Sequence, residues 1–376
     1  MNGLLMLDVF ALVVIVVHFG VPLLYYFYMK KKWLGRPWNL KFDKNYKPKV
    51  TIIIPTYNEA KLIEVKLDNI YAQEYPRDSL EVVIVDSAST DGTLDIVKKW
   101  ISQHGDINIK IFEEPERRGM VPALNYVLQH CQINGEVVIF TDVDAFWEGD
   151  TLKRIVKYFA DSSVGAVTAG IAPIATLAID DPLERSYRNY FTQLRIAESK
   201  AHSTPIHNGA LIALRTSLLY KIGGLPEYTG NNDSTPASII AFMGYRAIHA
   251  DDVVVKELIK EGQVLRKIRR AQHLILHFLK TKQYSKKLGF YSPAKQFQKI
   301  WQIEWWLHII NPWLLIVAIA LLIVSTLHTS PVAPIILGIG LVLLISSTYR
   351  MWILQQLYLV IGAVRNLWTK ELVWRK

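Results

Sequence analysis

The sequence predicts an α/β fold with a mostly parallel sheet, joined to transmembrane helices, one N-terminal and about two C-terminal. Two observations support this prediction. Short β-branched runs alternate with segments of helical spacing between residues 49 and 169, which is typical of strand–helix–strand units. Long apolar stretches lie at residues 9–28 and beyond residue 305, although 20% of the 376 residues are charged. The apolar residues are therefore concentrated at the two ends of the chain.

The alternation defines each element of the predicted sheet in turn. Strands are expected at residues 49–54, 82–85, 107–112, 137–141 and 164–169. Helices are expected between them, at residues 59–72, 91–103, 121–130 and 151–159. In such sheets ligands bind beyond the carboxyl ends of the strands, so the residues that follow each strand are the candidates for function.

The apolar stretches are long enough to cross a membrane. Residues 9–28 reach the roughly 20 residues that a span needs, and three lysines follow at residues 30–32. Because the lysines follow the apolar core, this segment is expected to be an uncleaved anchor whose N-terminus lies outside. Residues 306–327 form a second predicted span with tryptophans at its start, and residues 332–348 form a third.

The basic residues set the expected orientation. Lys and Arg outnumber Asp and Glu by 12 to 4 in residues 251–300, just before the second span. Residues 351–364 are followed by a basic tail, so we expect an interfacial helix or a tilted continuation of the third span. We therefore expect an integral protein of the cell membrane whose soluble domain is cytoplasmic. Its predicted divisions are an anchor (1–39), the soluble domain (40–265), a basic amphipathic interfacial segment (266–300) and a C-terminal transmembrane region with an interfacial tail (301–376).

Composition and missing motifs exclude several classes of protein. Cys131 is the only cysteine, which excludes a disulfide framework. The formal net charge of +10 is concentrated beside a predicted span, which favours membrane contact over nucleic acid. The sequence contains no G-x-G-x-x-G, no phosphate-binding lysine loop and no H-E-x-x-H. Dinucleotide oxidoreductases, P-loop enzymes and zinc proteases therefore lose their main support.

Two carboxylates follow the strand predicted at residues 137–141. Asp142 and Asp144 are separated by one residue, and paired oxygen ligands of this kind suit Mg²⁺ or Mn²⁺ with a phosphorylated substrate. The alternative is that they cap the helix near Thr151 or face solvent. The pair on its own is a weak signal, but other polar residues at neighbouring strand ends strengthen it.

Those neighbouring strand ends carry further polar residues with two interpretations each. Tyr57 could stack on a base or pack in the core, and Asp86 could bind a base or ribose or simply form a turn. Arg117 and Arg118 precede a predicted helix, where they could hold a diphosphate or form a solvated charged face. Asp91 is best explained as a helix cap.

Taken together and in order, these motifs resemble family-2 glycosyltransferases. The resemblance extends over about residues 50–275 and rests on the segments IIPTYNE (53–59), VDSASTDGT (85–93), RGMVPALN (118–125), TDVD (141–144), NGALIALR (208–215) and GNND (230–233). It implies a Rossmann-like GT-A fold that binds a nucleotide-diphosphate sugar through Mn²⁺ or Mg²⁺. It also implies an inverting transfer to a membrane-associated, lipid-linked glycan acceptor, with no nucleic acid as partner.

The resemblance assigns expected roles to particular residues. Asp142 and Asp144 would bind the metal, and Asp233 would be the catalytic base. The expected donor-binding residues are Pro55, Tyr57, Glu59, Asp86, Arg117, Arg118, Asp142, Asp144, Arg269 and Arg270. His207 and Asn208, just before the apolar run at 210–214, are candidates for acceptor binding, although a loop histidine is often only structural.

The sequence also departs from the family pattern. Ser87 and Ala88 stand where the family often has Asp and Gly, and Asn231 and Asn232 replace the Thr and Glu before Asp233. The Q-x-x-R-W motif of processive synthases is missing, and its nearest counterpart is RKIRR at residues 266–270. A catalytically silent, membrane-tethered nucleotide-binding scaffold and a processive polysaccharide synthase therefore stay open as alternatives, and UDP- and GDP-sugars both fit as donors. A transporter has little support, because the spans lack a pattern of charges.

Overall fold

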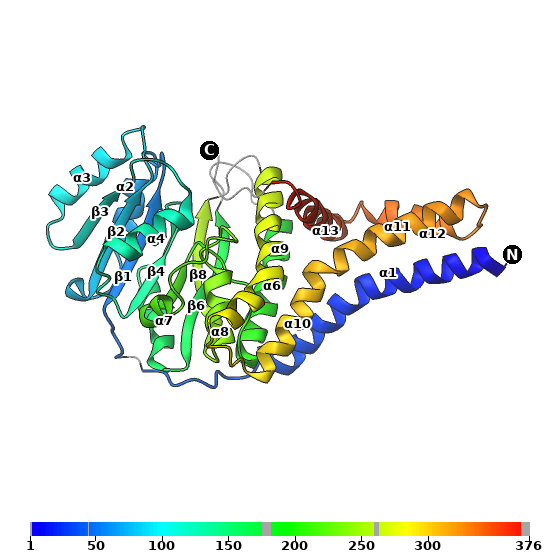
Figure 1. The fold of residues 1–376 in the computed structure, drawn as a ribbon, viewed down its shortest axis with the longest axis horizontal. Coiled ribbons are helices and arrows are strands. Elements are labelled where there is room, and N and C mark those ends of the chain that lie inside the picture. Colours follow the sequence, from blue (N-terminus) through cyan, green and yellow to red (C-terminus); the bar gives the residue numbers. More distant parts are fainter. Residues whose placement is uncertain (1, 44, 175–181, 259–262, 370–376) are drawn as a thin grey trace.

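The computed structural model describes residues 2–43, 45–174, 182–258 and 263–369. An α/β domain lies at one end of the molecule and a group of long apolar helices extends from it at the other (Figure 1). The predicted fold class, a curled and mostly parallel sheet with apolar helices near both chain ends, is confirmed.

Within the described residues the strands form one eight-stranded sheet with the order β3-β2-β1-β4-β7-β6-β8-β5. Its first half is parallel and contains β3 (Asn108–Glu113), β2 (Leu80–Asp86), β1 (Val50–Thr56) and β4 (Val137–Phe140). Its second half is mixed and contains β7 (Ile212–Arg215), β6 (Val164–Ile174), β8 (Arg246–Leu258) and β5 (Ala145–Phe146). The carboxyl ends of the four parallel strands thus share one edge.

The central strands are buried on both faces, which explains their continuous apolar runs. Ile52, Val82 and Ile84 face a core shared with α2 (Ile63–Tyr71), α3 (Thr93–Gln103) and α5 (Thr151–Val156). Ile53 and Val83, one residue along each strand, face the opposite core. That core is shared with α4 (Met120–His130), α7 (Thr216–Lys221), α8 (Ser234–Phe242), α9 (Gln263–Lys287) and α10 (Lys295–Ile309).

Two observed differences from the predicted elements have physical causes. The helix expected from residue 59 begins at Ile63, because the Glu59 carbonyl accepts from Leu62 and Ile63 and closes a turn. The helix expected at 151–159 ends as a 3₁₀ turn from residue 157.

The expected interfacial segment 266–300 contributes Phe278 and Phe297 to the domain core, where both rings contact Trp301. These two residues thus pack within the α/β domain, and the interfacial position of the segment stays a prediction.

The apolar helices match the first two predicted spans. Helix α1 (Asn2–Met29) continues into a π-helical turn (Lys30–Leu34), and α10 leads into α11 (Asn311–Leu327). The helical segments Met6–Leu34 and Lys295–Leu327 are long and apolar enough to cross a membrane. Asp8 accepts hydrogen bonds from Ser325 and Ser330, which joins the far ends of α1 and α11.

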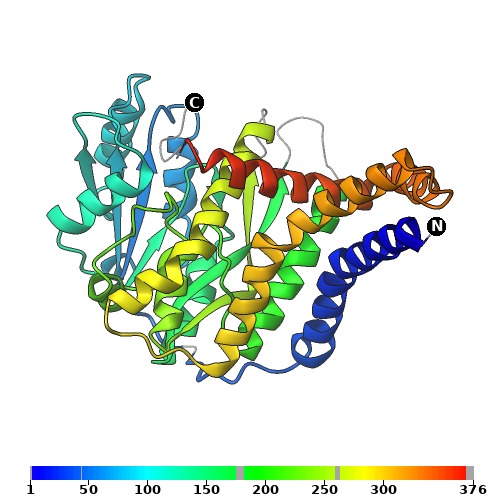
Figure 2. The ribbon, with the colours of Figure 1, turned by 45° about the vertical axis from the view of Figure 1, so that its right-hand side comes forward.

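The third predicted span is not straight. Helix α12 (Ala333–Leu343) has 11 residues, too few for a span, and α13 (Ser347–Arg365) turns away from it by 106°. Leu359 of α13 packs against Ala271 and Ile275 of α9, so α13 runs back to the α/β domain (Figure 2). Residues 347–365 thus continue the third predicted span only through this sharp bend, and the choice between an interfacial helix and a tilted continuation stays a prediction. The basic tail residues Lys370, Arg375 and Lys376 lie outside the described residues.

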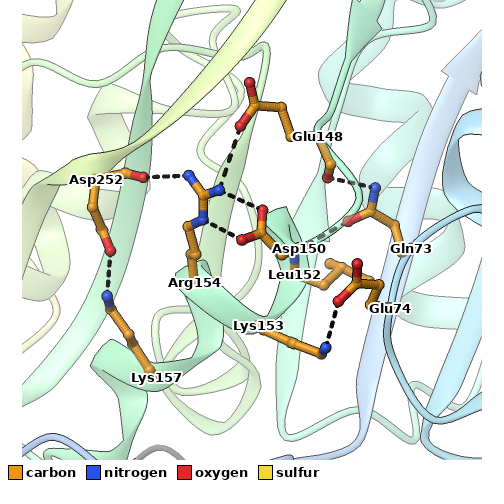
Figure 3. Close-up of polar contacts among 9 residues, drawn as sticks. All are labelled: Gln73, Glu74, Glu148, Asp150, Leu152, Lys153, Arg154, Lys157 and Asp252. Carbon is orange, nitrogen blue, oxygen red and sulfur yellow. Dashed lines mark hydrogen bonds and ion pairs between the residues drawn. The ribbon is translucent and has the colours of Figure 1, made fainter.

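A surface network fastens α5 to its neighbours (Figure 3). The Arg154 guanidinium contacts Asp150 at 2.7 Å and the Asp252 carbonyl at 3.1 Å, and Lys157 contacts the Asp252 carboxylate. Lys153 bonds Glu74 at 2.7 Å. These ion pairs are partly exposed and each contributes little stability alone, but together they join α5 to β8 and to the loop after α2.

Candidate active site

The ends of β1, β2 and β3 form a polar surface that we call the donor edge, made of Tyr57, Asp86, Ser87, Glu114, Arg117 and Arg118. The Arg117 guanidinium lies 3.7 Å from the centre of the Tyr57 ring, so these two expected donor-binding residues meet. Pro55 pairs with Val85 at the ends of β1 and β2, and the Glu59 N–H donates to Thr93 at 2.9 Å. The N-cap of α3 is Gly92 rather than Asp91, but the Asp91 carboxylate still accepts from the first N–H of the helix, that of Thr93, at 3.1 Å.

Asp86 is held in place by hydrogen bonds to both of its carboxylate oxygens. Oδ1 accepts from the hydroxyls of Thr56 at 2.8 Å and Ser89 at 2.5 Å, and Oδ2 accepts from the Ser89 N–H at 2.8 Å. Ala88 adopts φ +57°, a conformation that favours glycine, and this tight turn brings Ser89 back to Asp86. Asp86 is only 1% exposed, so the carboxylate is fixed before any ligand arrives.

Glu114 is a site residue that sequence reasoning missed. Its carboxylate accepts from the Ser87 hydroxyl at 2.7 Å and from Arg118 at 2.8 Å, and its N–H donates to the Asp86 carbonyl at 2.8 Å. The spacing of Glu114 and Arg118, four residues apart, was a possible signal. The bond to Ser87 was not visible in the sequence, because it joins the ends of two different strands.

Asp142 and Asp144 follow β4 with a buried lysine beneath them. Lys66 of α2 is fully buried, and its Nζ donates to the Thr141 hydroxyl at 3.1 Å and to the Ala145 carbonyl at 2.5 Å. It therefore fastens both ends of the turn that carries the two carboxylates. Burial lowers the pKa of Lys66 to about 7, and the neighbouring Asp142 and Asp144 oppose that shift.

Asp233 and Asp142 both lie close to Gly209. A Cβ at Gly209 would lie 3.6 Å from an Asp233 carboxylate oxygen and 3.9 Å from an Asp142 carboxylate oxygen. Asp233 is the N-cap of α8, where its side chain accepts from the Ser234 N–H. Burial raises the pKa of Asp233, and the Ser234 hydrogen bonds and Arg270 oppose this shift. The expected metal site and the expected base thus face the same small volume.

Arginines of α9 border this volume. Arg266 and Arg270 are four residues apart, lie on one face of the helix, and each contacts Glu257 at 3.4 Å. Arg270 also influences the charged states of Asp142 and Asp233. Arg269, the other expected donor-binding arginine, lies about 100° around the helix from Arg270. Arg266 is therefore a residue of this face that the sequence analysis did not select.

His207 and Asn208, the expected acceptor residues, lie near Asp233, with His207 buried and Asn208 half-buried. His207 exchanges backbone hydrogen bonds with the Ser234 hydroxyl at 2.9 and 3.2 Å. Within the described part of the chain, three buried atoms have no hydrogen-bond partner. They are the two ring nitrogens of His207 and the Oδ1 atom of Asn208. Burial lowers the pKa of His207, so its ring is neutral. We call the group Asp142, Asp144, His207, Asn208 and Asp233 the transfer centre.

The paired carboxylates fit a divalent metal that also binds a diphosphate. Burial raises the pKa of Asp142, and the nearby Asp144 raises it further, as expected where two buried carboxylates crowd one another. A divalent cation would relieve this repulsion. Among the described residues no group of three or more His, Cys, Asp and Glu side chains could hold a metal ion. Two carboxylates of this kind would suit Mg²⁺ or Mn²⁺, which take their remaining ligands from phosphate and water.

Comparisons with known proteins agree with this geometry. The family described as Glycosyl transferase family 2 matches residues 51–223. A mannosyltransferase from Pyrobaculum calidifontis, solved in complex with GDP-Man and Mn²⁺, is 45% identical over 96% of this chain and 99% of that chain, with a TM-score of 0.85.

Two further relatives match over shorter stretches. A dolichyl N-acetyl-α-D-glucosaminyl phosphate 3-β-D-2,3-diacetamido-2,3-dideoxy-β-D-glucuronosyltransferase of Methanococcus voltae is 38% identical over 29% of this chain. A β-monoglucosyldiacylglycerol synthase of a Synechocystis species is 31% identical over 50% of it. The matched parts are 33% and 39% of those relatives' lengths. The motifs, the GT-A-like sheet and the full-length similarity to a solved mannosyltransferase together place this chain in glycosyltransferase family 2.

Proposed function

We propose that this chain transfers mannose from GDP-mannose to a lipid-linked acceptor at a membrane surface, with inversion at the anomeric carbon and with Mn²⁺ or Mg²⁺. The single observation that carries the chemistry is the approach of Asp142 and Asp233 to the same point beside Gly209. The donor assignment is supported by the 45% identity with a mannosyltransferase whose structure holds GDP-Man and Mn²⁺.

The transfer step follows from the positions of the side chains. Asp233 accepts the proton of the acceptor hydroxyl while that oxygen bonds to the anomeric carbon of the donor. The bond from this carbon to the diphosphate oxygen breaks on the opposite side, and GDP leaves with the bonding electrons. A metal on Asp142 and Asp144 would neutralise charge on the leaving diphosphate, and Arg270 adds a positive charge beside it.

The proposed acceptor is supported by the apolar helices and by the names of two relatives. Helices Met6–Leu34 and Lys295–Leu327 would hold the domain at the bilayer. The Methanococcus voltae and Synechocystis relatives carry names of enzymes that use a dolichyl phosphate sugar and a diacylglycerol lipid. The Lys30–Lys32 cluster after the first helix favours a cytoplasmic domain. The buried polar atoms of His207 and Asn208 would bind hydroxyls of the acceptor sugar.

The test is nucleotide release by the purified full-length protein with GDP-mannose and a panel of UDP-sugars, in the presence of Mn²⁺ and a lipid extract. We expect GDP release that depends on lipid and falls about 10²- to 10⁴-fold in Asp233→Asn. Asp95→Asn, an exposed acid on α3, is the matched control and should keep wild-type rates. Release from a UDP-sugar instead would contradict the donor, and GDP binding without turnover would favour the scaffold.

A further inference from the structure

Glu114 is a buried carboxylate beside the expected base-binding residue Asp86, and no motif of the sequence selects it. We propose that Glu114 makes the donor edge selective for guanine over uracil. This inference rests on the proposed GDP-mannose donor. It concerns the nucleobase rather than the sugar or the acceptor.

The position of Glu114 compensates for a departure in the sequence. Ser87 stands where related motifs often carry a second Asp, and the Glu114 carboxylate lies 2.7 Å from the Ser87 hydroxyl. The Glu114 N–H also donates to the Asp86 carbonyl at 2.8 Å, which sets the two residues side by side. The donor edge therefore has two neighbouring carboxylates, the second delivered by β3 instead of β2.

The two nucleobases differ in what they present to such a pair. The pairing edge of guanine carries two adjacent donors, the N1–H and the 2-amino group, whereas uracil has one N–H between two carbonyl oxygens. A second carboxylate accepts from the additional donor of guanine but repels the carbonyl oxygen that uracil places there. Asp86 differs from Glu114 in what holds its oxygens, because Thr56 and Ser89 donate to Asp86 from its own turn and strand, whereas one Glu114 oxygen is held by the half-exposed Arg118.

Arg118 links base recognition to diphosphate binding. Its guanidinium covers one Glu114 oxygen at 2.8 Å, while the Arg118 side chain is 44% exposed and the Glu114 side chain is fully buried. When Arg118 turns to the diphosphate, it leaves a buried charged oxygen without its donor, which is unfavourable. The 2-amino group of guanine replaces that donor, and uracil has nothing to offer in its place.

The experiment measures GDP and UDP binding to the full-length protein with Mn²⁺ by calorimetry. Wild type should prefer GDP, and Glu114→Gln, which keeps the shape and loses the charge, should lower the GDP-to-UDP affinity ratio at least tenfold. Glu113→Gln is the matched control, because Glu113 is the adjacent residue and pairs with Lys98 at the surface. It should keep the wild-type ratio. A ratio in Glu114→Gln within twofold of wild type would overturn the proposal.

A second measurement needs no variant and protects the test against misfolding. Inosine diphosphate keeps the guanine N1–H and lacks the 2-amino group, so wild type should bind it at least tenfold more weakly than GDP. Equal affinity for the two nucleotides would also overturn the role of Glu114. A wild-type preference for UDP would instead contradict the proposed donor, so the two failures are distinguishable.

Discussion

At the donor edge both oxygens of Asp86 accept hydrogen bonds, and both oxygens of Glu114 do as well. At the transfer centre, on the mixed half of the same sheet, His207 is equally buried, yet its two ring nitrogens have no partner among the described residues. Asp142 crowds Asp144 there as well. The donor edge is complete as the chain folds, whereas the transfer centre has hydrogen-bonding and charge capacity that a metal and an acceptor would complete.

The difference has an energetic meaning. A satisfied buried polar cluster rigidifies a site and supports folding, whereas an unsatisfied one costs stability. We therefore expect the donor edge to support folding as well as binding, and the transfer centre to lower stability in return for function. Substitutions in the two regions should thus act in opposite directions on stability. Four predictions sharpen the comparison of the two regions, and the last two test this difference in sign.

The largest effect is expected at the metal pair. Asp144→Asn should lower the rate of nucleotide release about 10²- to 10³-fold, because charge on the leaving diphosphate is no longer neutralised. Chelation by EDTA should have the same effect on wild type, and Mn²⁺ binding followed by electron paramagnetic resonance should weaken in the variant. Asp150→Asn, in the surface network with Arg154, is the control and should stay near wild type. A fully active Asp144→Asn protein would remove the metal pair from the mechanism.

At acid pH the mixed half of the sheet, which holds the transfer centre, should unfold locally before the parallel half. Burial lowers the pKa of His249 to about 4 and of His277 to about 3, while both would titrate near 6.5 in the unfolded chain. The unfolded state therefore binds more protons between these values, so this contribution to stability is present above pH 6.5 and is lost as the pH falls toward 4. Hydrogen exchange at pH 5 should rise in β8 and α9 before β1–β3. Equal exchange in both halves would contradict this prediction.

At the donor edge, removing one hydrogen-bond donor should destabilise the fold. Thr56→Val keeps the shape of the side chain but leaves the buried Asp86 carboxylate with one fewer donor, so unfolding free energy should fall by about 1–3 kcal/mol. The Thr216 hydroxyl, which donates to the neutral Gly135 carbonyl at 2.7 Å, provides the comparison. Thr216→Val should cost less, because its acceptor is uncharged. Urea denaturation measures both, and equal losses would show that the charge of Asp86 adds nothing to the value of its donor.

At the transfer centre a substitution is expected to raise the free energy of unfolding rather than lower it. This is the smallest of the four effects. His207→Leu removes polar atoms that are buried without partners, so thermal stability should rise by about 1 kcal/mol while the transfer rate falls. His249→Leu is the matched control, because the His249 ring bonds the Ala250 carbonyl at 3.0 Å and should lose stability when replaced. A less stable His207→Leu protein would contradict the prediction, because it would mean that the imidazole nitrogens do have hydrogen-bond partners.

Much of the parallel half was predictable from local sequence. The apolar runs predicted β1, β2, β3 and β4 within two residues. Strands β1, β2 and β4 are buried on both faces and read as continuous apolar segments, whereas β3 is a partly exposed edge strand. The strands of the mixed half were harder to predict from the sequence. Strand β8 contains charged residues at Asp251 and Asp252, which pair with Lys200 and Lys157 from distant helices, so its apolar signal is interrupted.

The sequence by itself determined the motif order, the strand-end carboxylates and the long apolar helices, because these depend on neighbours in the chain. Tertiary structure decided the partners. Glu114 reaches Ser87 across 27 residues, Lys66 reaches Thr141 across 75, and Asp233 and Asp142 both come close to Gly209. It also decided the 106° bend that returns α13 to the α/β domain. Such contacts depend on strand order and helix packing, which no local pattern encodes.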